Sequence, residues 1–243
     1  MNFTLHDEQL FLAPERALDW PRRRTLLVAD AHFGKAASYR AHGMPVPAGT
    51  TADNLRRLDA AIDRHGAERV IFLGDFMHDG HGHNPLTLAA LRDWRARRSQ
   101  LALALVGGNH DARAGALPAD LRIDALPEGW REDGFALCHH PQPVAGAYTL
   151  AGHLHPAWRL ATRRDGVRLP CFWFGTRVGV LPAFGAFTGG LLAAAAPGDA
   201  ICVVTPERVF AVPRGGMAFS STPARASASL IDQSPGMTAY GRD

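Results

Sequence analysis

The sequence has few cysteines, no long apolar run and no long block of like charge. Its three cysteines (Cys138, Cys171 and Cys202) are odd in number, widely spaced and set among apolar residues. This pattern is typical of buried reduced thiols rather than of a disulfide framework or a zinc knuckle. The apolar stretch GLLAAAA, at 190–196, is far shorter than the roughly 20 residues of a membrane-spanning helix. The first 20 residues lack the basic start and apolar run of a signal peptide. These features predict a cytoplasmic protein without a membrane span.

The charge balance is close to even. Lys and Arg number 26 against 23 Asp and Glu, and the pI is near 9.1. A mildly basic chain of this kind permits a nucleic-acid partner but does not require one. Short arginine clusters such as PRRR, at 21–24, are interpreted as solvated faces. With 243 residues and 47% hydrophobic content, the chain is long enough for one domain with a sizeable core.

The first half of the chain alternates strand-like and helix-like segments. The expected strands cover 25–30, 69–75 and 101–108, and the expected helices cover 50–66 and 85–99. The βαβαβ order predicts a layered α/β domain.

After about Pro127 the pattern changes to short strands and hairpins, which predict a second sheet. The expected strands and hairpins cover 134–140, 148–155, 158–174 and 200–212. Residues 213–243 are rich in Ser, Gly, Pro and Ala and have little to bury, so we expect a disordered tail there. The prediction is therefore a single domain over 1–212 followed by that tail.

Residues of metal-ligand type follow five of the expected strands. They are Asp30 and His32 in VADAHFGK, Asp75 in FLGDF, Asn109 and His110 in VGGNHD, His139 and His140 in ALCHHP, and His153 and His155 in LAGHLHP. Because the carboxyl ends of strands in such a sheet share one rim, we expect these motifs to converge. In extended backbone, residues i and i+2 point the same way, so D-A-H and H-L-H could each grip one ion.

The donor set combines oxygen and nitrogen and has no thiolate, which suits Mn, Fe, Zn, Ni or Co better than a structural zinc. Its size exceeds the need of one tetrahedral ion and fits two ions that share a bridging carboxylate. Each motif alone has a simpler reading as a turn or as a surface histidine. All five together, in this order, favour a metal site.

These motifs, D-x-H, G-D, G-N-H-D, a strand-end His and G-H-x-H over residues 30–156, resemble the calcineurin-like metallophosphoesterase superfamily. The resemblance implies a four-layer αββα sandwich with two mixed β-sheets and a dinuclear centre. It implies that Asp30, His32 and His155 hold one ion, that Asn109, His139 and His153 hold the other, and that Asp75 bridges them. It also identifies His110 as the catalytic histidine, with Asp111 orienting it from behind, while the adjacent glycines make room.

The CHHP motif offers two candidates for the strand-end ligand. His139 is preferred because it comes first after the apolar FAL, where the rim of the sheet is expected. His140 is then interpreted as a ring packed under Pro141 and hydrogen-bonded locally.

The implied chemistry is phosphate-ester hydrolysis. Two divalent cations against two carboxylates leave a net positive site that attracts phosphate oxygens. Water bridging the ions would be deprotonated near neutral pH and would attack phosphorus in line with the leaving oxygen. His110 would either protonate the leaving alkoxide or hydrogen-bond a non-bridging oxygen, and both roles stay open.

Residues 12–58 resemble more narrowly the ligase-associated DNA-damage-response endonucleases (PdeM). This resemblance implies a phosphodiesterase acting on nucleic acid in DNA repair, with manganese as the expected metal. Its implied functional associates are a DNA ligase, a nuclease and a helicase. Lys35 and Arg40 would contact phosphate, or else be solvated charges on a loop. The residues His78, His81 and His83 follow Asp75 and either overhang the site or belong to a flexible polar loop, of which the loop is the preferred interpretation.

Two other functions remain open at this point. The protein could be a phosphatase or nucleotide phosphodiesterase of the same superfamily that acts on a small substrate. It could also be a metal-stabilised DNA-binding subunit without turnover, although the intact histidine of GNHD argues against this. The sequence does not determine the oligomeric state.

Overall fold

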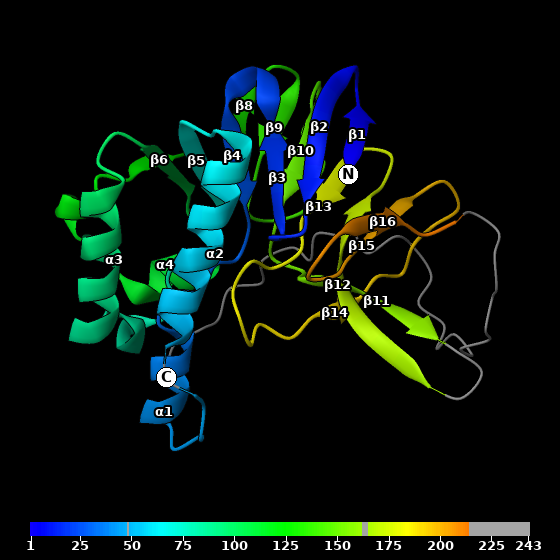
Figure 1. Ribbon diagram of the computed structural model, residues 1–243. Helices are drawn as coiled ribbons and strands as arrows, with labels where there is room; N and C mark the ends of the chain where they lie inside the picture. The colour runs from blue at the N-terminus through cyan, green and yellow to red at the C-terminus, as the bar shows by residue number, and fades with distance from the viewer. Residues whose placement is uncertain (48, 162–164, 214–243) are drawn as a thin grey trace, which may run out of the picture.

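The computed structural model describes residues 1–47, 49–161 and 165–213, which form two β-sheets packed face to face with helices against one of them (Figure 1). The first sheet has seven strands in sequential order: β1 (Asn2–Leu5), β2 (Glu8–Ala13), β3 (Ala17–Trp20), β4 (Thr25–Val28), β5 (Arg69–Leu73), β6 (Ala102–Val106) and β7 (Asp124–Leu126). The strands β1 to β4 pair antiparallel, whereas β4 to β7 pair parallel. This sheet is therefore mixed.

The second sheet has nine strands and is also mixed. Its strands are β8 (Trp130–Glu132), β9 (Phe135–Leu137), β10 (Tyr148–Ala151), β11 (Pro156–Ala161), β12 (Gly166–Phe174), β13 (Val178–Val180), β14 (Leu191–Leu192), β15 (Ala200–Val204) and β16 (Val209–Ala211). The pairs β9–β10 and β10–β13 run parallel, and the hairpins β11–β12 and β15–β16 run antiparallel. The expected hairpins over 158–174 and 200–212 are confirmed.

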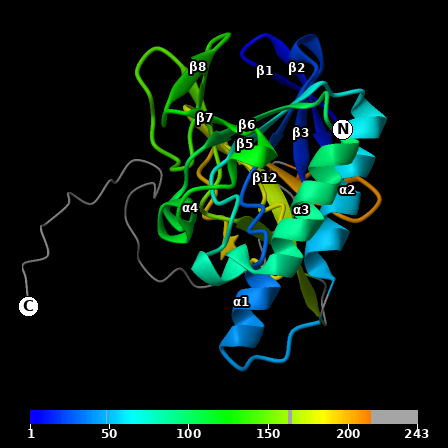
Figure 2. The ribbon, with the colours of Figure 1, turned by 90° about the vertical axis from the view of Figure 1, so that its left-hand side faces the viewer.

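The helices of the described chain are few and lie early in it. They are α1 (Lys35–Ala41), α2 (Thr50–His65), α3 (Pro85–Arg97) and α4 (Asn109–Ala114), with short 3-10 helices η1 (Pro21–Arg23), η2 (Gly80–His83) and η3 (Ala119–Leu121). The long helices α2 and α3 lie side by side over the first sheet (Figure 2). Both were predicted from sequence, and α2 ends at Gly66, whose φ of 60° gives the left-handed cap expected of glycine.

Two apolar layers hold these elements together, and they follow from the alternation of side chains along each strand. On β5, Val70 and Phe72 face α2 and α3, in a cluster that contains Leu58 and Trp94. Ile71 and Leu73, which alternate with them on β5, face the second sheet. They belong to the apolar cluster between the two sheets, which also contains Phe172. Burial on both faces explains why the central strands read as continuous apolar runs.

The packing brings the ends of five strands to one edge of the sandwich. In the first sheet β4, β5 and β6 are parallel neighbours, and in the second β9 and β10 are parallel neighbours. A bridge between Ala29 and Ala183 joins the chain after β4 to the loop before β14. The rim expected from sequence is thus shared between two sheets, rather than formed by one.

Two expectations concern regions beyond these elements. None of the helices among the described residues combines the length and apolar character needed to span a bilayer, and the cytoplasmic location stays a prediction. The expected disordered tail, 213–243, falls outside the described residues except for Pro213, so the domain limits also stay a prediction.

Candidate metal centre

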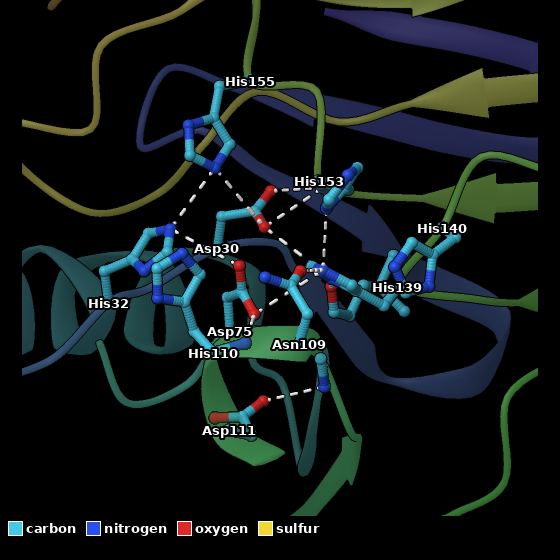
Figure 3. Close-up of polar contacts among 12 residues, drawn as sticks. Asp30, His32, Asp75, Asn109, His110, Asp111, His139, His140, His153 and His155 are labelled. Carbon is cyan, nitrogen blue, oxygen red and sulfur yellow. Dashed lines mark hydrogen bonds and ion pairs between the residues drawn. The ribbon is translucent and has the colours of Figure 1, made fainter. Parts of the chain in front are cut away.

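The structure brings the predicted site residues together at the shared edge of the two sheets (Figure 3). Those from the first sheet follow β4, β5 and β6: Asp30 and His32, then Asp75, then Asn109 and His110 at the start of α4. Those from the second sheet follow β9 and β10: His139, then His153 and His155. Residues far apart in the sequence thus surround one small volume.

One half of the cluster contains Asp30, His32 and His155. The Nε2 atoms of His32 and His155 are 3.3 Å apart, and the His155 Nε2 atom is 3.5 Å from the Asp30 Oδ1 atom. Ligand atoms about 2.0–2.2 Å from one ion lie at most about 4.4 Å from one another. These three side chains therefore have the spacing of a coordination shell.

The other half contains Asn109, His139 and His153. The His139 Nε2 atom is 2.9 Å from the Asn109 Oδ1 atom and 3.0 Å from the His153 Nδ1 atom. The His139 imidazole is fully buried. This group also has the spacing and the donor chemistry of a divalent-cation site.

Asp75 lies between the two halves and has one carboxylate oxygen near each. Its Oδ2 atom is 3.7 Å from the His32 Nε2 atom, and its Oδ1 atom is 3.5 Å from the His139 Nε2 atom. The backbone N–H of His110 also donates to Oδ1, at 2.9 Å. This is the position that a bridging carboxylate requires.

The backbone at these residues is left-handed rather than extended. The φ angles are 52° at Asp30, 45° at His32, 49° at Asp75, 71° at His153 and 49° at His155. The argument that D-A-H and H-L-H act through extended i and i+2 positions is therefore wrong. Non-glycine residues in this region are uncommon and cluster at functional sites, where the surrounding structure imposes the conformation.

Three glycines allow the close packing beneath the cluster. A Cβ atom on Gly74 would lie closer than 3.0 Å to the His139 ring, and one on Gly108 would lie closer than 3.0 Å to the Asp75 carboxylate. A Cβ atom on Gly152 would be 2.7 Å from the Asp30 Oδ2 atom. Gly107, by contrast, has open space at its Cβ position, so of the GG pair only Gly108 makes room.

Burial sets the protonation of the cluster. It raises the pKa of Asp75, against the charge of His139, and it lowers the pKa of both His32 and His153. Although burial opposes it, the hydrogen bond and charge of Asp30 raise the pKa of His155. Burial thus favours the neutral imidazole at His32 and His153, which is the form that divalent metals bind.

His110 is half-buried at the edge of the cluster, and a backbone carbonyl orients its ring. Its Nδ1 atom lies 2.5 Å from the carbonyl oxygen of His78. Because a carbonyl can only accept, Nδ1 carries the proton, which leaves Nε2 as the nitrogen available to a substrate. The ring stacks on that of His78, with centroids 4.8 Å apart, and lies edge-on to His32 at 4.9 Å.

His78 lies against the cluster, which was the less favoured of its two interpretations from sequence. It was interpreted as part of a flexible polar loop, yet its Nδ1 atom is 3.3 Å from the His32 Nδ1 atom. Burial and the charge of Lys35 lower its pKa to about 4. Two of its loop neighbours lie elsewhere: His81 contacts the ring of His42, and the buried Nε2 atom of His83 has no hydrogen-bond partner among the described residues.

Asp111 does not hold the His110 ring in the way expected. Its Oδ1 atom accepts from the backbone N–H of Met77, and its Oδ2 atom accepts from that of Gly108, both at 2.9 Å. The carbonyl of His78 occupies the place expected for this carboxylate. Asp111 instead caps α4 and ties the chain after β5 to the chain after β6.

The two predicted phosphate contacts differ in position. Lys35 is buried at the start of α1, and burial lowers its pKa against the attraction of Asp30 and Asp75. It is therefore directed at the cluster. The Arg40 side chain is exposed and donates to the carbonyls of Val46 and Pro47 at 3.3 and 3.1 Å. The structure does not bring Arg40 to the cluster.

The two histidines of CHHP also differ. The His139 side chain lies inside the cluster, whereas 48% of the His140 side chain is exposed, with its Nδ1 atom 3.4 Å from Glu128. His140 is thus held locally, by Glu128 rather than by packing under Pro141. Its ring still lies 4.8 Å from that of His153, so it flanks the second half of the cluster.

Comparison with known proteins relates this geometry to a family. Residues 23–169 match the model of the calcineurin-like phosphoesterase family. A solved nuclease from Pseudomonas putida, MPE, is 42% identical with a TM-score of 0.78, over 87% of this chain and 99% of that chain. A phosphoesterase from E. coli, Yfce, is 15% identical with a TM-score of 0.38, over 73% of this chain and 86% of that chain. This similarity is too low to support a conclusion about the chain. The curated proteins gave no match. The chain therefore belongs to the calcineurin-like phosphoesterase family and is a hydrolase of phosphate esters.

Proposed function

We propose that the protein is a nuclease that hydrolyses phosphodiester bonds in nucleic acid with two divalent ions. Asp30, His32 and His155 would hold one ion, Asn109, His139 and His153 the other, and Asp75 would bridge them. The observation that carries this assignment is the position of Asp75, whose two oxygens lie near His32 and His139 respectively. Bound divalent ions would activate a water molecule and neutralise charge on phosphate oxygens.

The side chains around the ions would position the phosphate and handle its proton. His110 presents Nε2 because Nδ1 is bonded to the His78 carbonyl. Protonated at Nε2, it would donate to the leaving oxygen or to a non-bridging oxygen of the phosphate. Lys35 would add positive charge on the same side, since it is close enough to lower the pKa of His32 and His78.

Three finer assignments belong to this proposal. Nucleic acid is the proposed substrate because the similar solved protein is described as a nuclease and the chain is mildly basic. Manganese is the proposed metal among Mn, Fe, Zn, Ni and Co, all of which suit carboxylate, amide and imidazole donors without thiolate. A role in DNA repair beside a DNA ligase, a nuclease and a helicase rests on the sequence resemblance alone.

A side-by-side assay tests the proposed function. The protein, stripped of metal and reloaded with Mn²⁺, is given single-stranded DNA, bis(p-nitrophenyl) phosphate and p-nitrophenyl phosphate. We expect metal-dependent cleavage of the DNA and of the diester and little hydrolysis of the monoester. An Asp75→Asn variant controls for contaminating nucleases, because it removes charge from the shared ligand.

The other outcomes identify the alternatives. Turnover of the monoester alone would identify a phosphatase. Turnover of the chromogenic diester without cleavage of DNA would favour a small-molecule phosphodiesterase. A metal-dependent rise in melting temperature with no product from any substrate would identify a DNA-binding subunit without turnover.

A further inference from the structure

A second concave region lies directly beside the metal centre. It is a pocket of about 240 Å³, and its lining includes Arg16, His155, Arg168, Thr188, Gly189 and Gly190. His155 forms a wall common to the pocket and the cluster, because its Nε2 atom faces Asp30 while its Nδ1 atom is 3.0 Å from the Thr188 carbonyl. The volume is below the roughly 300–1,000 Å³ of pockets for drug-sized ligands. It suits a small group that is attached to something bound at the centre.

The pocket contains positive charge that the described protein does not neutralise. Arg16 is half-buried and Arg168 is exposed; the one hydrogen bond described for the Arg16 side chain is a long contact of 3.4 Å from Nη1 to the Ala183 carbonyl. Within residues 1–47, 49–161 and 165–213, no carboxylate lies within 4.0 Å of either Arg16 or Arg168. A partly buried guanidinium without an anion is costly. Burial accordingly lowers the pKa of Arg16.

The pairing of strands adds to this unbalanced charge. Arg168 on β12 lies directly opposite Arg159 on β11 in the antiparallel ladder. Both side chains are exposed, and like charges in directly opposite positions are destabilising. The hairpin therefore carries two cations side by side, next to a pocket.

The backbone of the pocket offers further donors. Thr188, Gly189 and Gly190 form its rim, and the N–H groups of the two glycines donate no hydrogen bond to any residue of the described chain. Guanidinium groups and free backbone N–H groups are the donors that bind phosphate oxygens in proteins. The chemistry of the pocket is thus that of a phosphate site.

We propose that this pocket binds a second phosphate of the substrate strand, next to the phosphate that is hydrolysed. The inference rests on the proposed function, since it requires a substrate with more than one phosphodiester phosphate. Because His155 lines both the pocket and the cluster, the pocket would hold the phosphate one nucleotide along the substrate from the phosphate that is hydrolysed. The protein then selects linkages that have a phosphate on one particular side, which favours cleavage within a strand over cleavage of an isolated diester.

Three short substrates test the proposal. They are the thymidine dinucleotide TpT, the same dinucleotide with a 5′-phosphate, pTpT, and the same with a 3′-phosphate, TpTp. Cleavage of the internal linkage is followed by chromatography and expressed as kcat/KM. We expect the wild-type protein to prefer one of the two phosphorylated substrates over TpT by about 10-fold or more, the scale of charge-assisted hydrogen bonds. TpT serves as the internal reference because it carries no phosphate for the pocket.

The double variant Arg16→Ala, Arg168→Ala should bring this preference close to 1. The matched control is Arg177→Ala, an exposed arginine beyond the other end of β12. The stretch of β12 from Arg168 to Phe174, where the strand ends, is about 20 Å long at 3.3 Å per residue. The control should keep the wild-type preference. With a longer single strand, the slope of log(kcat/KM) against log[salt] should fall by about 0.7 for each phosphate contact removed.

The remaining outcomes separate the two proposals. Equal rates for the three substrates in the wild type, or a preference that survives in the double variant, would overturn the pocket assignment alone. A double variant that loses TpT cleavage and metal together would show that the arginines support the centre rather than bind phosphate. A wild-type protein that cleaves single-stranded DNA but none of the three would overturn the pocket assignment alone, whereas one that hydrolyses bis(p-nitrophenyl) phosphate but cleaves neither DNA nor the three would overturn both proposals.

Discussion

At the scale of single residues, the glycines that leave space beneath the cluster are as important as the ligand candidates themselves. A Cβ atom on Gly108 would meet the Asp75 carboxylate, whereas one on Gly107 would meet open space. Gly108→Ala should therefore displace Asp75, destabilise the fold by about 1–3 kcal/mol and lower metal content and turnover together. Gly107→Ala is the matched control and should behave as wild type in elemental analysis and rate. Equal metal content in both variants would show that Asp75 tolerates displacement.

The bridging position of Asp75 predicts an asymmetry between two ligand variants. Asp75→Ala should abolish activity and lower the content of both ions, because it removes the ligand that both share. Asn109→Ala should mainly weaken one ion, because its contact within the cluster is to His139. Elemental analysis of the two purified variants measures this difference. If both retain two metals per chain, the assignment of ligands is wrong.

The position of His110 at the edge of the cluster predicts that one mutation can separate catalysis from metal binding. His110→Ala should keep both ions and lose roughly 100-fold or more in turnover, the usual scale for acid-base or electrostatic groups. An aryl ester leaves without a proton, so it should lose less than an alkyl ester if His110 is the acid. Equal losses would indicate stabilisation of charge on the phosphate.

His139→Ala is the comparison variant for His110→Ala. It should cost metal as well as rate, because His139 lies between Asn109 and His153. A His110→Ala protein that lost a metal while His139→Ala kept two would reverse the two assignments.

At the scale of elements, α4 is a short helix whose first residues carry the site. The Asp111 carboxylate accepts from the N–H groups of Gly108 and Met77, and thereby fixes the start of α4 against the chain after β5. Asp111→Ala should cost about 1 kcal/mol or more in the free energy of unfolding, the scale of a lost N-cap. It should also lower turnover, because His110 and Asp75 move apart. Denaturant unfolding and kcat measure the two effects.

An Asp111→Asn variant sharpens that prediction. Its amide can still accept one of the two hydrogen bonds, so it should lie between the wild type and Asp111→Ala in both measurements. A variant with normal stability and lowered turnover would instead assign Asp111 a direct catalytic role.

Elements with a continuous apolar run or a clear helical period were predictable from sequence, whereas others were not, among them β1, β2 and β3. The strands β4, β5 and β6 and the helices α2 and α3 have continuous apolar runs or clear helical periodicity. The strand β3 was missed because its Asp19 is buried, and that residue is accommodated by His65, with the Asp19 Oδ2 and His65 Nδ1 atoms 3.0 Å apart. The strands β7, β8, β13 and β14 have two or three residues each, too few to show a period.

The features of the site divide in the same way into those that were predictable from sequence and those that were not. The residues that follow the predicted strands converge as expected, because strand order places their ends at one edge. The position of His78 against His110, and that of Asp111 against Met77, depend on contacts between loops. A single sequence carries no local signal for such contacts. The left-handed backbone at Asp30 is likewise imposed by the surrounding fold.

At the scale of the whole molecule, the candidate metal centre lies where the two sheets meet. Ligand candidates come from the first sheet (Asp30, Asp75) and from the second (His139, His153), so bound ions would cross-link them. Removing metal with a chelator should therefore lower the melting temperature. Saturation at 100 times Kd stabilises by about 2.7 kcal/mol per site, which is roughly 5–10 °C for a chain of this size.

Differential scanning calorimetry, with and without chelator, measures this shift. Adding Mn²⁺ back should restore the melting temperature, and an Asp75→Ala protein should show neither the loss nor the recovery. An unchanged melting temperature in the wild type would mean that the sheets are held together without the ions.

The left-handed backbone at the ligand candidates has a consequence for how this sequence can drift. Glycine adopts positive φ most easily and asparagine more easily than most other residues, so replacement of Asp30 or His153 by either would relieve the chain. Buried charge would also disappear with Asp30. In the metal-free protein such replacements would relieve the backbone, whereas in the metal-loaded protein they would also remove the stabilisation that bound ions supply. Metal binding and catalysis together oppose that drift, so a copy of the gene whose product no longer binds metal should change first at these positions while its product still folds.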